Sequence, residues 1–168
     1  MVRASRGFTL IEMVITLVVI GILAAGIGSA LTGGAVAFNS TTDAVDTLGK
    51  LRVATERMAR EIREVRRDPG GYAITTMTAS DLVFTKADGT RVTLKSSPPQ
   101  ITLAYDSPAG AHTLCDQVGS AGFQYLQADG STAATGPGDV KFVVIQVVLT
   151  ANGNNYPQRT RVALRNSS

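Results

Sequence analysis

The sequence predicts an α+β fold: a long N-terminal helix, apolar in its first half, whose second half packs on an antiparallel β-sheet. Three observations predict it: an almost uncharged apolar run near the N-terminus, a helical periodicity directly after it, and short alternating runs from residue 72 onward. The 168 residues allow one folded domain and little else. One cysteine and a net charge of +3 argue against a disulfide framework and against a typical nucleic-acid binder.

The apolar run covers residues 8–31 and carries one charge, Glu12. A helix of this length extends roughly 36 Å, and about 20 apolar residues cross the bilayer core. Arg3 and Arg6 are the only charges before it. Because cytoplasmic flanks of membrane segments favour Lys and Arg, we expect residues 1–7 to stay inside and the remainder to cross outward.

Glu12 is the anomaly of this run, since a carboxylate within a membrane helix costs about 2.5–3.5 kcal/mol. One interpretation is that it reaches the lipid headgroups. Another is that it pairs with an amine: a cut after Gly7 would give Phe8 a new α-amino group, and opposite charges about 4 Å apart attract by about 4 kcal/mol at an effective dielectric of 20. The pair can form between two subunits, or within one subunit.

The string RGFTLIEMVITLVVIGILAAG closely resembles the processing motif of type IV pilins and of the related pseudopilins of type II secretion. The resemblance implies that a membrane prepilin peptidase cuts after Gly7, making residues 1–7 a leader, and methylates the amine of Phe8. It also implies that Glu12 is the carboxylate used in assembly. An ordinary secretory signal peptide cut at residues 28–30 is the rival interpretation, but it leaves Glu12 without a purpose.

Residues 32–68 predict an amphipathic continuation of the same helix, so that residues 8–67 form one helix. Charges on the outer face are predicted to pair at i,i+4, and Pro69 with the following glycines to end the helix. Bending near the membrane end would rest on glycines, because no proline precedes Pro69. The predicted apolar face has alternating spacings of four and three: Ala44, Leu48, Leu51, Thr55, Met58, Ile62 and Val65. The predicted pairs are Arg52 with Glu56, Arg57 with Glu61 and Arg60 with Glu64.

Residues 72–168 predict a β-rich globular domain. Strands are expected at 82–85, 91–94, 101–105, 123–127, 140–150 and 160–164. Asn152-Gly153 is a hairpin signal between the last two. Residues 96–99 and 130–138 are expected to be surface loops.

Two C-terminal segments, LCDQVGSAGFQYLQADG and VVLTANGNNYPQRTRVALRN, look like the minor-pilin branch of the same family. They are similar to subunits of the mannose-sensitive haemagglutinin pilus type and to the larger minor pseudopilins. Many major pilins close a C-terminal loop with two cysteines. Cys115 alone cannot do this, which favours a minor pilin or a pseudopilin.

No other cluster predicts a cofactor or metal. His112 and Cys115 supply two ligands where zinc needs three or four, so we expect a loop histidine and a buried or half-buried thiol. An intermolecular disulfide of that thiol is a minor alternative. The aspartates at 43, 46, 129 and 139 lack calcium-loop spacing. The arginines at 57, 60, 63, 66 and 67 could meet DNA phosphates, but interleaved glutamates favour a solvated helix face.

The sequence therefore predicts a structural subunit and no enzyme: a minor pilin of a type IV pilus-like filament, anchored in the inner membrane with its C-terminal domain in the periplasm. Expected partners are the prepilin peptidase, other pilin or pseudopilin subunits, the inner-membrane assembly platform and, before assembly, the lipid bilayer; nucleic acid is not expected. The alternatives are a minor pseudopilin of type II secretion, a DNA-uptake minor pilin, and an unprocessed single-pass membrane protein that displays a binding domain.

Overall fold

The computed structural model describes residues 9–164. Gly7 and Phe8, the predicted cleavage site, lie outside them. The chain divides into two compact units, Met1–Asp43 and Ala44–Ser168, and one continuous helix, α1 (Leu10–Arg63), contributes to both.

In the first unit the described chain is helix α1 alone, unbroken through the glycine-rich stretch where the sequence would allow bending or melting. Each glycine there has open space where a Cβ would stand, so packing within the subunit does not require these glycines.

In the second unit, α1 ends at Arg63, before the expected residues 67–68. Val65 N–H reaches back to the Ile62 carbonyl at 3.3 Å, a three-residue bond that tightens the final turn. Arg66 N–H then donates to the Thr85 carbonyl at 2.9 Å. This hydrogen bond to Thr85, which is distant in sequence, takes the chain out of the helix before Pro69, the residue predicted to end it.

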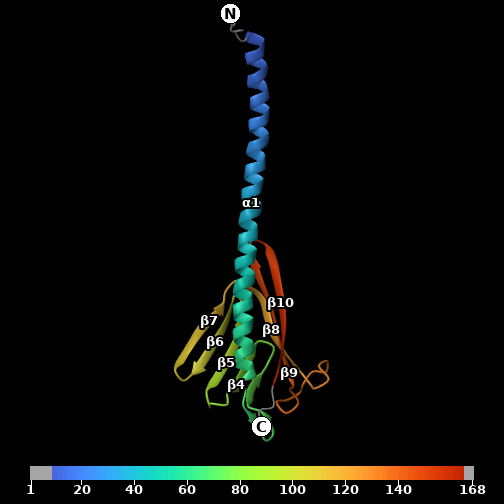
Figure 1. Ribbon diagram of the computed structural model, residues 1–168. Helices are drawn as coiled ribbons and strands as arrows, with labels where there is room; N and C mark the ends of the chain where they lie inside the picture. The colour runs from blue at the N-terminus through green and yellow to red at the C-terminus, as the bar shows by residue number, and fades with distance from the viewer. Residues whose placement is uncertain (1–8, 165–168) are drawn as a thin grey trace, which may run out of the picture. The chain divides into compact units, whose positions relative to one another are not determined.

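The expected fold class is confirmed, with antiparallel sheets packed against the helix (Figure 1), although residues 9–164 form three sheets where one was expected. The smallest is the hairpin β1 (Arg67–Asp68) with β2 (Gly71–Tyr72). A five-stranded meander holds β3 (Ile74–Met77), β4 (Asp81–Thr85), β5 (Arg91–Ser97), β6 (Gln100–Asp106) and β7 (Ala109–Cys115) in chain order. The three-stranded meander holds β8 (Val118–Leu126), β9 (Phe142–Ala151) and β10 (Asn154–Ala163).

The β9–β10 hairpin turns where the sequence predicted. Asn152 and Gly153 have φ of 51° and 77°, the positive values that a two-residue hairpin turn of this hand requires. The register pairs Ala151 with Asn154 and continues to Phe142 with Ala163. This long ladder makes β9, the strongest β-branched run, the central strand of its sheet.

Strand β7 was not predicted, and the expectation of a loop histidine was wrong: His112 lies within β7, opposite Leu103. The sequence AGAHTLC is small and polar, and much of the strand is exposed. It is an edge strand, held by β6 alone in its sheet. Pairing with β6, not local propensity, makes it a strand.

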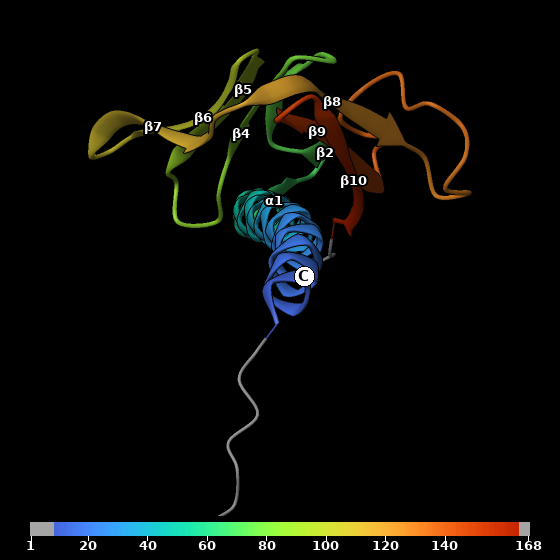
Figure 2. The same cartoon turned by 90° about the horizontal axis from the view of Figure 1, so that it is seen from above.

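The two larger sheets lie next to each other across one side of helix residues 44–63 (Figure 2). Hydrogen bonds join them along β8: Phe123 N–H donates to the Ala79 carbonyl at 2.8 Å, and Ser96 Oγ to the Ala121 carbonyl at 3.0 Å. Tyr125 Oη donates to the Thr78 carbonyl at 2.8 Å. These hydrogen bonds hold the two larger sheets together as one layer, although no continuous strand ladder connects them.

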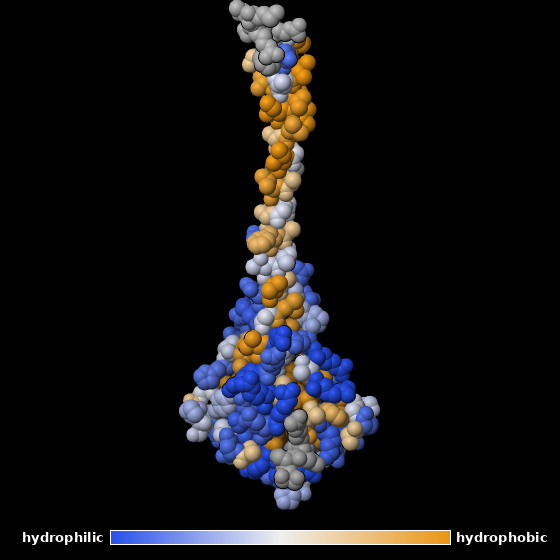
Figure 3. All heavy atoms as spheres, in the orientation of Figure 1, coloured by the Kyte–Doolittle hydropathy of each residue, from blue (hydrophilic) through white to orange (hydrophobic). Residues whose placement is uncertain are grey.

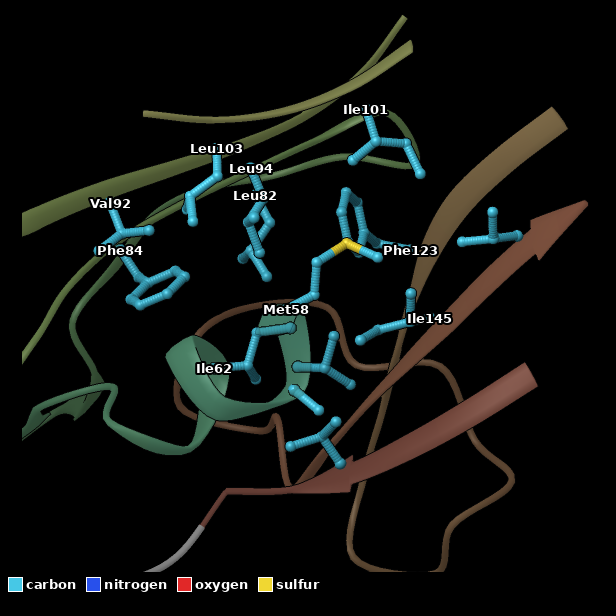
Figure 4. Packing of buried hydrophobic residues seen from close by; sticks show 14 of the residues in the cluster. Met58, Ile62, Leu82, Phe84, Val92, Leu94, Ile101, Leu103, Phe123 and Ile145 are labelled. Atoms are coloured by element: carbon cyan, nitrogen blue, oxygen red, sulfur yellow. The ribbon is translucent and has the colours of Figure 1, made fainter. Parts of the chain in front are cut away.

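The core lies between this layer and the helix. Figure 4 shows Met58 reaching from α1 between Leu82 on one side and Phe123 on the other. The predicted apolar face is buried from Leu51 onward, whereas Leu48 is 50% exposed. Leu48 lies beyond the end of the core, in a groove lined by α1 and β10 side chains. Ala54 and Ala59 are buried as well, because small side chains let the helix approach the sheets closely.

A buried acid anchors the C-terminal end of α1. Glu61 is 3% exposed, and its Oε1 accepts from Tyr105 Oη at 2.8 Å and lies 2.9 Å from Arg57 Nη2. Lys86, between β4 and β5, lies 3.5 Å from Glu61 and 2.8 Å from Glu64. The hydrogen bond to Glu64 raises the pKa of the Lys86 ammonium. Burying a charge is tolerated when it is paired, so this cluster fixes helix to sheet.

Two of the three predicted helix pairs are present, Arg52 with Glu56 at 2.8 Å and Arg57 with Glu61. Among the described residues, Glu64 pairs with Lys86 and not with Arg60. A sheet residue has replaced the helical partner, which sequence spacing could not reveal.

Met58→Ala should lower the free energy of unfolding by about 2–5 kcal/mol, because it leaves a cavity between both sheets and the helix. The matched control is Val53→Ala on the same helix, where the side chain is 68% exposed; it should change stability by less than about 0.5 kcal/mol. Denaturant unfolding of the detergent-purified chain, followed by tyrosine fluorescence, measures both. Equal losses would contradict the assigned core.

Burial raises the pKa of the Tyr125 phenol. The native state therefore holds this proton at pH values where the unfolded chain releases it, so stability should fall as pH rises above about 10, the ordinary tyrosine value. Tyr125→Phe should flatten this alkaline loss, measured by unfolding at pH 8 to 12. Tyr156→Phe is the control and should retain it; identical pH profiles for the two variants would count against the assignment.

Candidate processing and assembly segment

Thr9 stands immediately before helix α1. The Glu12 N–H lies 3.3 Å from Thr9 Oγ1 and 3.1 Å from the Thr9 carbonyl. Thr9 therefore caps the helix, satisfying a backbone donor that has no partner within the helix. The spacing Thr-x-x-Glu is that of a capping box, a signal that was present in the sequence and that the sequence analysis missed.

Glu12 lies in the first turn of α1 and is exposed. The partial positive charge of a helix N-terminus favours an acid at this position. Within residues 9–164 the structure gives Glu12 no cationic partner. The predicted partner, the amine of Phe8, lies outside the described residues, so the pairing stays a prediction.

The helix that carries Glu12 presents apolar side chains all round. Fifteen large ones between Leu10 and Phe38 are 48–84% exposed. Figure 3 shows hydrophobic spheres along this stretch of α1. An 18-residue window has mean hydropathy 2.6, and none of it is buried within the subunit. By length and composition this helix can cross a membrane.

Hydroxyl groups on this helix bond to its own backbone. Thr16 donates to the Glu12 and Met13 carbonyls, both at 2.9 Å, and Thr32 to the Gly28 carbonyl at 3.2 Å. Thr41 donates to the Ala37 carbonyl at 2.9 Å. An unpaired hydroxyl is costly in lipid or in a dry helix bundle, so these bonds suit the segment to either setting.

The thiol and the histidine do not form a reactive centre. Cys115 is 4% exposed, and burial raises the pKa of its thiol, which keeps it protonated and unreactive. The neighbouring Asp116 carboxylate lies 3.6 Å from Lys50. Among residues 9–164, no group of three or more potential ligands could hold a metal ion.

Most of the arginines considered for DNA contact already interact within the subunit. Arg57 bonds Glu61 and Tyr105, Arg66 bonds Asp68 at 2.8 Å, and Arg67 lies 5.8 Å from the centre of the Tyr72 ring. Arg60 and Arg63 make no ion pair within the described residues and line a groove beside β10.

Asp129, one of the aspartates considered for calcium, is hydrogen-bonded to residues of its own loop. Its carboxylate accepts bonds from the backbone N–H groups and the hydroxyls of Ser131 and Thr132. These donors hold the pKa of the Asp129 carboxyl well below its usual range. The aspartate therefore shapes a turn.

Residues 2–28 match the family model described as the prokaryotic N-terminal methylation motif. The chain carries a prepilin-type methylation motif. The match spans Gly7, Phe8 and Glu12 and supports a type IV pilin-like protein, whose family is structural. It implies processing by prepilin peptidase and assembly with other pilin subunits, and with the apolar helix it fits a membrane-anchored pilin. No curated protein matches the chain.

Ile20→Arg should weaken membrane insertion and raise the fraction of chain that is extracted, because an arginine at the centre of a membrane helix costs about 2.5–3.5 kcal/mol on insertion scales. Alkaline extraction of membrane fractions measures the effect. Val53→Arg, on the same helix outside the apolar run, is the control and should leave the chain in the membrane. An extracted fraction of the Ile20 variant no larger than that of the Val53 variant would contradict a membrane-spanning role.

Proposed function

We propose that the protein is a minor pilin, a low-abundance structural subunit of a type IV pilus-like filament. The match of residues 2–28 to the methylation motif carries the proposal. The apolar surface between Leu10 and Phe38 supports it, because a filament core of packed helices covers such a surface as lipid does. Cys115 is buried and not in a disulfide, which is consistent with a subunit that has no C-terminal disulfide loop.

In this proposal residues 1–7 are the leader, removed after Gly7, and Phe8 is the methylated first residue. Residues 8–31 wait in the inner membrane, and residues 72–168 lie in the periplasm until assembly. The assembly platform then moves the helix from lipid into a bundle of other subunits. Lipid chains are as apolar as leucine, so the transfer is driven by packing and polar pairing, not by a hydrophobic gain.

Glu12 supplies the polar pairing in this proposal. Its carboxylate meets the α-amino group of Phe8 on a neighbouring subunit, which sets the axial register. A mispaired subunit would leave one charge alone in the apolar core, at a cost of about 3–5 kcal/mol. The cap made by Thr9 supports this role, because it fixes the first turn on which the carboxylate stands.

A minor pseudopilin of type II secretion is the main alternative, and the same motif and helix support it equally. The DNA-uptake alternative has less support, since three of its five arginines already interact within the subunit. Binding to a duplex at physiological salt ordinarily draws on more phosphate contacts than two free arginines supply.

Mass analysis of the native N-terminus tests the processing. We expect the mature chain to begin at N-methylated Phe8 when prepilin peptidase is present, and at Met1 when it is absent. Gly7→Leu should block cleavage, whereas Ala4→Leu in the same leader should not. A mature chain that begins elsewhere would falsify the proposed processing.

Glu12→Ala should leave cleavage intact and lower incorporation into filaments by about a hundredfold or more, because it leaves the amine of Phe8 without its partner at a cost of about 3–5 kcal/mol. Immunoblots of sheared filaments against membrane fractions measure the ratio. Asp139→Ala, an exposed loop acid, is the control and should assemble normally. Normal assembly of the Glu12 variant would contradict the proposed pairing between Glu12 and the amine of Phe8.

A further inference from the structure

Strand β7 ends the five-stranded sheet, and its outer edge has no strand partner among residues 9–164. Figure 2 shows β7 at the far end of the sheet layer, with no described element beyond it. The two-residue turn before β7 pairs Asp106 with Ala109. By the alternation of an antiparallel ladder, Gly110 and His112 then turn their backbone N–H and C=O groups away from β6. The edge therefore offers an unpaired row of donors and acceptors.

The other edges of the two larger sheets are protected from strand addition. Strand β10 contains Pro157, which has no N–H to donate, and the charged Arg159 and Arg161. Strand β3 has only four residues, and the free side of β8 is covered through the bond from Phe123 N–H to the Ala79 carbonyl. Proline, charge, shortness and cover are devices by which proteins block sheet edges. The β7 sequence AGAHTLC has seven residues, no proline and no Lys, Arg, Asp or Glu.

Both ends of β7 are fixed. Before the strand, Asp106 Oδ1 accepts a hydrogen bond from the Arg91 N–H at 2.9 Å. After it, the Asp116 carboxylate lies 3.6 Å from Lys50 of α1. The edge is thus held in the extended form that an added strand requires, and a preorganised site loses less conformational entropy when it binds.

An exposed apolar side chain lies beside this edge on the side of α1. Lys50 contacts the chain just after β7, and Arg57 donates to Tyr105 Oη on β6 at 2.7 Å, so the stretch of α1 between them lies along this part of the sheet. That stretch carries Val53, which is 68% exposed. An added strand would therefore contact an apolar surface on its α1 side.

The β7 side chains define what kind of strand fits. His112 pairs with Leu103, a core residue, so it lies on the α1 side of the sheet. The opposite side carries only the small, exposed Ala109, Ala111 and Thr113. A second copy of β7 does not fit, because its own α1-facing side chains would again be glycine and histidine and would leave Val53 without an apolar contact. The fitting strand is uncharged and has apolar side chains at alternate positions.

We propose that β7 binds an extended segment of a different subunit of the filament, added to the sheet as an antiparallel strand. The segment pairs with about seven residues, roughly 24 Å of edge. Backbone hydrogen bonds supply the affinity and its alternate apolar side chains supply the specificity. The inference rests on the proposed function, since a low-abundance subunit has other proteins as its neighbours, and it identifies the surface through which one of them is held.

Photo-cross-linking in the full-length chain tests the register of this strand. A photo-reactive phenylalanine replaces Ala109, Ala111 or Thr113 in turn, and mass spectrometry of sheared filaments maps the attached residues. We expect the three positions to reach one segment of another subunit, at residues two apart and in reverse order, which capture of a neighbour alone would not give. Scattered sites, attachment to a second copy of this chain, or no attachment from any position overturns the proposal.

A proline tests the backbone bonds. His112→Pro removes an outward N–H and should lower the cross-linking yield from position 111, and the ratio of filament to membrane-bound protein, by about tenfold. His112→Val keeps the N–H and should change neither. Denaturant unfolding shows whether the proline variant is folded, and the register test does not depend on it. Unchanged yield in the folded proline variant, or equal losses in both variants, overturns the added strand.

The outcomes separate this contact from the proposed function. Filaments that contain the chain with a normal Phe8 N-terminus but show no reverse-order cross-links overturn the β7 contact alone. A chain that is never cleaved or assembled overturns both.

Discussion

The exposed apolar side chains between Leu10 and Phe38 impose the main constraint on this protein, because water cannot be their final environment. Burying one large apolar side chain is worth about 1.5–3 kcal/mol, and fifteen such side chains between Leu10 and Phe38 are exposed here. Their combined cost in water is roughly tens of kcal/mol, more than the net stability of a typical domain. The helix must therefore lie in lipid or against other helices.

This constraint explains why polar groups matter so much on an apolar helix. Lipid and a helix bundle are nearly equivalent for leucine and valine, so apolar contacts alone cannot choose between the membrane and the filament, or between one register and another. In the proposed function, Glu12 at one end of the apolar helix makes that choice. The hydroxyls of Thr16, Thr32 and Thr41 do not compete, because the helix's own carbonyls already accept their protons.

The second unit follows the rules of an ordinary water-soluble α+β domain. Helix residues 44–63 complete its core, and Leu51, Met58 and Ile62 are fully buried. Glu61 binds the helix to β6 through Tyr105 and to the β4–β5 connection through Lys86. The helix is thus an integral layer of this unit, and the residues left exposed on its other side are available for contacts with neighbours.

Local patterns in the sequence were sufficient for the apolar segment, the amphipathic face from Leu51 onward, the β9–β10 hairpin and the fold class. Each depends on periodicity or turn chemistry between residues close in the chain. The tertiary structure alone decided the end of α1 at Arg63, the division into separate sheets and the edge strand β7. It also decided that Glu64 pairs with Lys86 and not with the predicted partner Arg60. The end of α1 and the Glu64–Lys86 pair depend on bonds between residues distant in sequence, and β7 depends on the ladder that it forms with β6. The residue pattern within one segment holds no record of such partners.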